Sequence, residues 1–145
     1  MVEKNKSRSD VAGSLYGSIL VIEDDDYLRE YLQELLELSG YDVLVAADGD
    51  KGLSLFRRFA PDTVLTDLIM PGKDGIRLIM EMKKINPDVR VIAMSGRWNN
   101  ESGVNCIEAV EFLGADSTLR KPFSAKDLKA ALMSALPKSA EMDCL

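Results

Sequence analysis

The sequence has 145 residues and a formal net charge of −6, from 18 Lys and Arg side chains against 24 Asp and Glu side chains. A chain of this length is most simply one domain with a sizeable core. Its acidic balance argues against binding to nucleic acid or to an anionic membrane surface, because both require clustered Lys and Arg. The chain contains no histidine, which excludes a Ser/His/Asp triad, a histidine zinc site and a phosphohistidine donor.

Residues 1–17 are rich in Ser, Lys, Asp and Gly without periodicity, so we expect a flexible N-terminal extension. Neither the apolar core of a signal peptide nor a run of roughly 20 apolar residues is present, which predicts a cytoplasmic protein. Cys106 and Cys144 lack metal-ligand spacing and are expected to be free thiols.

Short apolar runs then alternate with amphipathic segments. Ile19–Ile22 is typical of a buried strand, and Tyr27–Leu38 carries apolar residues at helical spacing behind Asp25 or Asp26 as the N-cap. The later elements are expected, in chain order, as a strand over Tyr41–Ala47, a helix over Lys51–Phe59, a strand over Asp62–Thr66, a helix over Asp74–Ile85, a strand over Val89–Met94, a weaker helix over Val104–Leu113 and a short strand over Ser117–Leu119.

A fifth helix is expected to begin at Ser124, because Asp127 three residues later approximates a capping box, and to end at Pro137. Residues 138–145 form a polar tail. Five strands alternating with five helices predict right-handed crossovers and one parallel sheet with helices on both faces. The predicted fold class is α/β, a doubly wound three-layer (βα)5 sandwich.

Parallel strands end at the same edge of a sheet, so polar residues that follow different strands become neighbours. Glu23 and Asp24 follow the first strand, Asp67 the third, Ser95 the fourth and Lys121 the fifth. Converging carboxylates repel one another unless a cation neutralises them, and oxygen ligands favour Mg²⁺, Mn²⁺ or Ca²⁺. An aspartate there could attack phosphorus and form an acyl phosphate, while Lys121 and Ser95 contact the transferred group.

Each of these residues also has a simpler interpretation. Asp67 could be a turn former, residues 23–26 an acidic helix cap, Ser95 part of a plain turn and Lys121 an exposed loop lysine. Complementary groups at four different strand ends are much less expected by accident than any one of them. The joint placement therefore favours a site.

The combination resembles the receiver domain of two-component response regulators, the family that includes the chemotaxis receiver protein. The resemblance covers Ser18–Pro137, which we take as the domain, and implies the flavodoxin-like strand order 2-1-3-4-5. The segments that carry it are Ile19–Asp26, Pro61–Gly75, Val91–Gly96 and Gly114–Phe123.

By motif position, the resemblance implies that Asp67 is the phosphoacceptor, that Ser95 is the switch hydroxyl and that Lys121 binds the phosphate. It implies Mg²⁺, or Mn²⁺, on Glu23, Asp24, Asp67 and the backbone carbonyl of Ile69. The phosphoryl donor would be a histidine kinase or a histidine phosphotransfer protein. Phosphorylation would then change contacts with a downstream protein through the fourth helix, fifth strand and last helix, with no nucleic acid or membrane partner.

Three departures from the family pattern stand out. Thr118 occupies the position where most receivers have Tyr or Phe, the loop after Ser95 is long and contains Trp98, and no output domain follows Pro137. We therefore expect a stand-alone receiver. The alternatives are a receiver-fold interaction module that no longer switches and a receiver excised from a larger hybrid kinase or regulator. A multi-turnover aspartyl-phosphate hydrolase is not expected, because Ile69 stands where such enzymes place a second acid.

Overall fold

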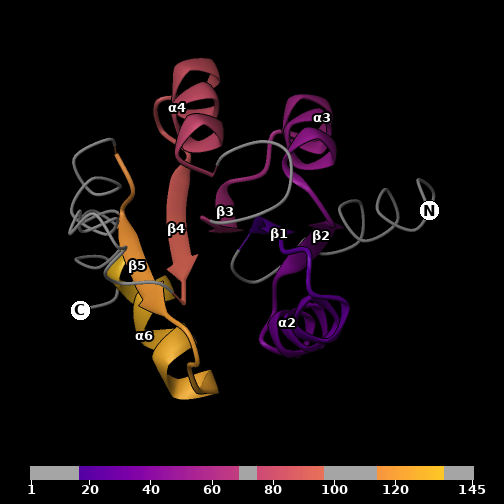
Figure 1. Cartoon of the computed structure of the whole chain (residues 1–145), viewed down its shortest axis with the longest axis vertical. Coiled ribbons are helices and arrows are strands. Elements are labelled where there is room, and N and C mark those ends of the chain that lie inside the picture. Colours follow the sequence, from indigo (N-terminus) through magenta and orange to yellow (C-terminus); the bar gives the residue numbers. More distant parts are fainter. Residues whose placement is uncertain (1–16, 69–74, 97–113, 136–145) are drawn as a thin grey trace.

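The computed structural model describes residues 17–68, 75–96 and 114–135 (Figure 1). The strands are β1 (Ser18–Ile22), β2 (Asp42–Ala46), β3 (Thr63–Asp67), β4 (Arg90–Ser95) and β5 (Ser117–Arg120), and the helices are α2 (Asp26–Leu38), α3 (Gly49–Phe59), α4 (Gly75–Ile85) and α6 (Ala125–Ser134). The helix expected over Val104–Leu113, the loop with Trp98, and Pro137 lie outside the described residues. None of the described helices is long and apolar enough to cross a membrane.

The five strands form one parallel sheet in the order β2-β1-β3-β4-β5, which confirms the predicted fold class and strand order. In the central pairs, Ile22 lies beside Thr66 of β3, and Asp67 lies beside Met94 of β4. Along the series β1, β3, β4, each strand therefore ends one residue beyond its neighbour. This register is what delivers the polar residues after each strand to a common edge.

Apolar side chains divide between the two faces of the sheet. Alternate strand residues such as Leu20 and Val64 pack with α3 and α4, whereas Ile19 and Leu65 pack with α2 and α6. In Figure 1, α3 and α4 accordingly lie on one side of the sheet and α2 and α6 on the other. The inner strands are buried on both faces, which explains why their sequences are continuously apolar rather than alternating.

Side-chain caps begin three of the helices. Asp25 caps α2, since its carboxylate accepts hydrogen bonds from the amides of Tyr27 and Leu28. Ser124 and Asp127 form the predicted capping box of α6. Asp48 caps α3, so that this helix begins two residues before the predicted Lys51. The predicted start was late because the first turn of α3 carries no apolar periodicity.

Two polar contacts fix the register at the opposite, amino edge of the sheet. Ser18 and Asp62 exchange hydrogen bonds, with the Ser18 amide donating to the Asp62 carboxylate at 3.1 Å and the Asp62 amide donating to Ser18 Oγ at 3.1 Å. The Asp116 carboxylate accepts from the Val91 amide at 2.8 Å and pairs with Lys83 Nζ at 3.1 Å. These contacts join β1 to β3 and β5 to β4 and α4.

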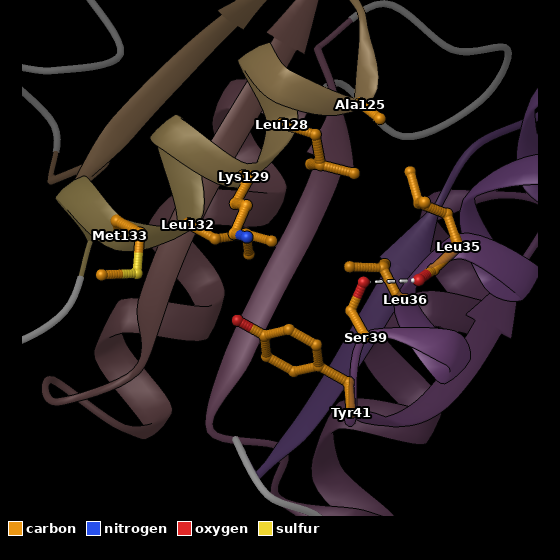
Figure 2. A pocket seen from close by; sticks show the side chains of 9 residues that line it. All are labelled: Leu35, Leu36, Ser39, Tyr41, Ala125, Leu128, Lys129, Leu132 and Met133. Atoms are coloured by element: carbon orange, nitrogen blue, oxygen red, sulfur yellow. Dashed lines mark hydrogen bonds between the residues drawn. The ribbon is translucent and has the colours of Figure 1, made fainter.

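The helices α2 and α6 do not close completely over their face of the sheet. They leave a cavity of about 250 Å³ with a mainly apolar lining (Figure 2). Tyr41 stands at one side of it and Met133 at the other, and Ser39 donates a hydrogen bond from Oγ to the Leu35 carbonyl at 2.7 Å. The packing between α2 and α6 on this side of the sheet is therefore incomplete.

The start of α4 lies directly against the end of β3. A Cβ atom added at Gly75 would meet the carbonyl oxygen of Leu68 at 2.5 Å and its Cα at 2.6 Å. Both are main-chain atoms that cannot rotate away. Glycine is thus required where α4 approaches the strand that carries Asp67.

We expect Gly75→Ala to lower the free energy of unfolding by about 2 kcal/mol, because the methyl group forces a backbone shift of the kind that overpacking causes. Gly96→Ala is the matched control, since among the described residues a Cβ there meets only Lys121 Cβ, at 3.8 Å. Urea denaturation followed by circular dichroism measures both. Equal unfolding midpoints for the two variants would contradict the close approach.

Candidate functional site

Glu23 is an acid held in the interior at the end of β1. The residue is 1% exposed, and its amide donates to the carbonyl of Ala46 at 3.0 Å. Its carboxylate accepts the Asp25 amide on Oε2 at 3.0 Å and the Lys121 ammonium on Oε1 at 2.7 Å. The main chain and the side chain of Glu23 are thus both fixed.

Asp67 is the last residue of β3 and is 5% exposed. The next amide, that of Leu68, donates to the carbonyl of Met94 at 2.9 Å and so continues the pairing with β4 past the carboxylate. Asp67 Oδ2 accepts a hydrogen bond from Lys121 Nζ at 3.0 Å. A second buried acid is therefore held at the same sheet edge.

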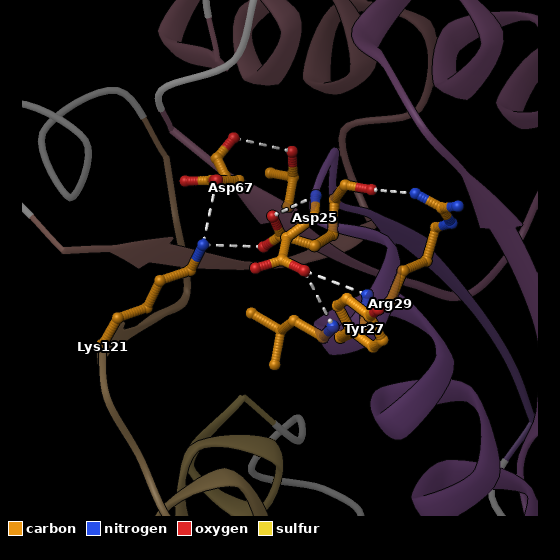
Figure 3. A network of polar contacts seen from close by, with 8 residues as sticks. Asp25, Tyr27, Arg29, Asp67 and Lys121 are labelled. Carbon is orange, nitrogen blue, oxygen red and sulfur yellow. Dashed lines mark hydrogen bonds and ion pairs between the residues drawn. The ribbon is translucent and has the colours of Figure 1, made fainter.

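Lys121 bridges the two buried acids. It follows β5, and its amide donates to the carbonyl of Ser95 at 2.9 Å, which places its side chain at the carboxyl edge. Figure 3 shows this side chain extended toward Asp67. The ammonium lies 2.7 Å from Glu23 Oε1 and 3.0 Å from Asp67 Oδ2, and the lysine side chain is 22% exposed.

The third acid, Asp24, is exposed and lies beside the other two. One carboxylate oxygen from each of Glu23, Asp24 and Asp67 lies within 4.8 Å of the others. Within the described residues, no hydrogen bond or ion pair holds the Asp24 carboxylate. The structure therefore brings the three predicted acids together, with two buried and one open to solvent.

The charges of the site perturb one another. Burial raises the pKa of the Glu23 carboxyl, and the nearby charge of Asp67 adds to this, while the hydrogen bonds from Lys121 and Asp25 oppose it. Burial tends to lower the pKa of Lys121, but the hydrogen bonds to Glu23 and Asp67 and the negative charges of these two acids together outweigh it, so the net pKa is raised. Lys121 therefore stays protonated, and one ammonium faces three carboxyl groups.

Ser95 is the last residue of β4 and is fully buried. It lies beside Arg120 in the pairing with β5, and its carbonyl accepts the Lys121 amide. The switch hydroxyl expected from the sequence is thus at the same edge as the acids. Ile69, whose carbonyl was expected to bind metal, lies outside the described residues.

Arg29 is a residue of this site that the sequence analysis missed. Its guanidinium donates from Nη1 to the main-chain carbonyl of Glu23 at 2.9 Å and from Nη2 to Asp26 Oδ1 at 2.6 Å. The spacing of Asp26 and Arg29 could have indicated their ion pair, since residues three apart meet on a helix. The contact with the Glu23 carbonyl leaves no signal in the sequence.

Oxygen ligands without His or Cys suit a hard divalent cation. A buried aspartate beside such a cation and a lysine is the arrangement required for charge-neutralised attack on phosphorus. Together the doubly wound sheet and this acidic edge define a class of α/β protein whose chemistry occurs at the carboxyl ends of parallel strands.

Comparisons with known proteins identify the family within that class. The family model for the response regulator receiver domain matches residues 19–133. The "Probable transcriptional regulator ycf27" of Porphyridium aerugineum is 40% identical over 118 residues, which are 81% of this chain and 47% of that protein. The solved structure of a response regulator receiver domain protein from Clostridium thermocellum is 34% identical, with a TM-score of 0.74 over 86% of this chain and 98% of that one. The chain belongs to the response regulator receiver domain family.

The curated relatives are longer proteins with different names. A "Cyclic di-GMP phosphodiesterase" of Thermotoga maritima is 33% identical over 119 residues, which are 82% of this chain and 31% of that protein. The chain spans about half the length of the Porphyridium relative and about a third of the Thermotoga one. What these proteins share with the chain is the receiver domain, a signalling domain of two-component systems whose acidic cluster binds Mg²⁺.

Replacing the bridging lysine should destabilise the protein. We expect Lys121→Ala to cost about 2 kcal/mol of folding free energy in metal-free buffer, because two buried carboxylates lose their shared partner. Lys126→Ala, at an exposed position of α6, is the control and should change stability by less than about 0.5 kcal/mol. Chemical denaturation in the presence of a chelator measures both, and equal effects would refute the bridge.

Proposed function

We propose that Asp67 accepts a phosphoryl group from the phosphohistidine of a partner kinase or phosphotransfer protein, in a Mg²⁺-dependent reaction. The observation that carries this proposal is the position of Lys121, whose ammonium joins Asp67 to Glu23 in a chain of the receiver family. The phosphorylated and unphosphorylated chains would then differ in their contacts with other proteins. The domain proposed for this role is Ser18–Pro137.

The transfer itself needs little from the protein beyond position and charge. A carboxylate oxygen of Asp67 attacks the phosphorus, an O–P bond forms, and the N–P bond of the donor breaks. The electron pair of that bond remains on the imidazole nitrogen, and the ring leaves as neutral imidazole because its other nitrogen carries a proton. Lys121 can follow the negative charge from the carboxylate to the phosphoryl oxygens, and the Ser95 hydroxyl donates a hydrogen bond to one of them.

The residues present fit a magnesium ion. Glu23, Asp24 and Asp67 supply oxygen atoms within 4.8 Å of one another, and two of these acids are buried where only a cation offsets their repulsion. Mn²⁺ would fit the same donors. When bound, the ion supplies positive charge that lets two anions, the carboxylate and the phosphoryl group, approach.

The proposed output runs from Ser95 toward β5 and α6. The Ser95 carbonyl accepts a hydrogen bond from the Lys121 amide, and Ser95 lies beside Arg120 of β5. A shift of Ser95 toward a phosphoryl group on Asp67 would therefore act directly on this strand. The helix expected over Val104–Leu113, which is the fourth helix of the expected output surface, lies outside the described residues. The proposed partner is a protein.

Thr118 favours a second candidate function, an interaction module that keeps the fold but does not switch. It lies in β5 beside Ala93, where most receivers place an aromatic ring whose rotation follows the hydroxyl. Such a module would bind its partner equally well with Asp67→Ala as with the unaltered chain. Affinity measurements with and without beryllofluoride, once a partner has been captured, distinguish the two functions.

Incubation with Mg²⁺ and acetyl phosphate should add one phosphoryl group to the chain, detected by intact mass. Asp67→Asn should abolish this modification, because an amide is not a nucleophile toward phosphorus. Asp88→Asn, which replaces an exposed aspartate just before β4 at the opposite edge of the sheet, should be modified as the unaltered protein is. An unmodified wild-type chain, or modification that persists in Asp67→Asn, would exclude Asp67 as the acceptor.

Millimolar Mg²⁺ should stabilise the folded protein by about 1 to 3 kcal/mol at concentrations 10 to 100 times Kd. The gain should be complete well above the raised pKa of Glu23 and should disappear as pH falls through it, because a protonated carboxyl is a poor ligand. In the metal-free protein, the pH dependence of the stability contributed by Glu23 has the opposite sign. There the raised pKa makes the contribution of Glu23 most favourable at low pH, and it is lost as pH rises through that pKa. Thermal unfolding from pH 4 to 8 measures both, and a Mg²⁺ effect independent of pH would contradict this ligand set.

A further inference from the structure

Asp24 differs from the other two acids in how it is held. Lys121 fixes the carboxylates of Glu23 and Asp67, whereas the Asp24 carboxylate is exposed and has no side-chain bond within the described residues. The position of such a group depends on its main chain. The orientation of the peptide between Glu23 and Asp24 therefore decides whether the third oxygen points into the cluster.

Arg29 holds this peptide from the side away from Lys121. Its Nη1 donates to the Glu23 carbonyl at 2.9 Å, and in Figure 3 the two cations approach the acidic loop from opposite sides of the view. The Arg29 side chain is only 21% exposed, although it lies in the first turn of a surface helix. The guanidinium thus sits against the loop, and its Nη2 bond to Asp26 at 2.6 Å secures its orientation.

We propose that Arg29 is a positioning residue for the cation site, which keeps Asp24 directed toward Glu23 and Asp67. This inference rests on the proposed function, because it assigns a residue to the same Mg²⁺ site. Arg29 acts through the peptide and not as a ligand. Groups that orient ligands in this way commonly change metal affinity by about 10-fold or more.

Charge and position predict opposite results when Arg29 is replaced. Loss of a positive charge near three carboxylates should by itself tighten the binding of a divalent cation. Loss of the hydrogen bond to the Glu23 carbonyl should weaken it, because Asp24 is then free to turn away. The direction of the change in Mg²⁺ affinity therefore separates positioning from simple electrostatics.

The test is calorimetric titration of the full chain with MgCl₂. We expect Arg29→Ala to weaken Mg²⁺ binding about 10-fold and Arg29→Lys to weaken it as well, because an ammonium lacks the two-pronged guanidinium geometry. Lys51→Ala is the matched control. Lys51 lines the same cavity between α2 and α3 as Arg29 but is exposed, so its loss removes charge alone and should leave affinity equal or slightly higher.

A kinetic measurement separates positioning from general loss of structure. With acetyl phosphate, the Mg²⁺ concentration for half-maximal modification of Arg29→Ala should rise about 10-fold, while the rate at saturating Mg²⁺ stays within about 2-fold of wild type. A purely structural role would lower stability and leave the half-saturating concentration unchanged.

The outcomes distinguish this inference from the function on which it rests. If the unaltered chain binds no Mg²⁺, the proposed function and this inference both fail. If the unaltered chain binds Mg²⁺ and Arg29→Ala binds it equally well or more tightly, the positioning role alone is overturned. Wild-type affinity in Arg29→Lys would likewise overturn the role of the guanidinium fork.

Discussion

The repulsion between carboxylates at the carboxyl edge of the sheet is the interaction on which the rest of the site depends. Glu23 and Asp67 are buried there, and charges taken out of water are costly unless a partner of opposite sign is close. Lys121 supplies that partner from a strand that is distant in sequence. The same repulsion favours the further cation proposed for this edge, since among the described residues the ammonium of Lys121 lies against a cluster of three acids.

The remainder of the fold holds these charges at fixed separations. The contacts of Ser18 with Asp62 and of Lys83 with Asp116 set strand register at the amino edge, and register at one end of a strand fixes it at the other. Gly75 lets α4 begin against β3 without displacing Asp67. The amino edge of the sheet thus carries contacts that fix strand register, and the carboxyl edge carries the candidate site.

Much of this architecture could be predicted from sequence because the signals are local. Continuous apolar runs indicated the buried parallel strands, and Ser124 with Asp127 indicated the cap of α6. The convergence of parallel strand ends at one edge predicted that the acids, Ser95 and Lys121 lie together. The contacts that sequence did not reveal are those of specific atoms. Which oxygens Lys121 bridges depends on packing across the sheet, and Arg29 binds a carbonyl, a group that every residue possesses.

Lys121 is supplied by β5, which is an edge strand with a single hydrogen-bonded neighbour in the described sheet. Edge strands are held by fewer main-chain bonds than inner strands, and local opening begins where such bonds are fewest. If β5 separates from β4, it carries the ammonium away and leaves Glu23 and Asp67 facing each other. Amide exchange at this strand thus reports on the charge balance of the pocket as well as on the strand itself. The buried acids are thus tied to the edge strand through the ammonium of Lys121.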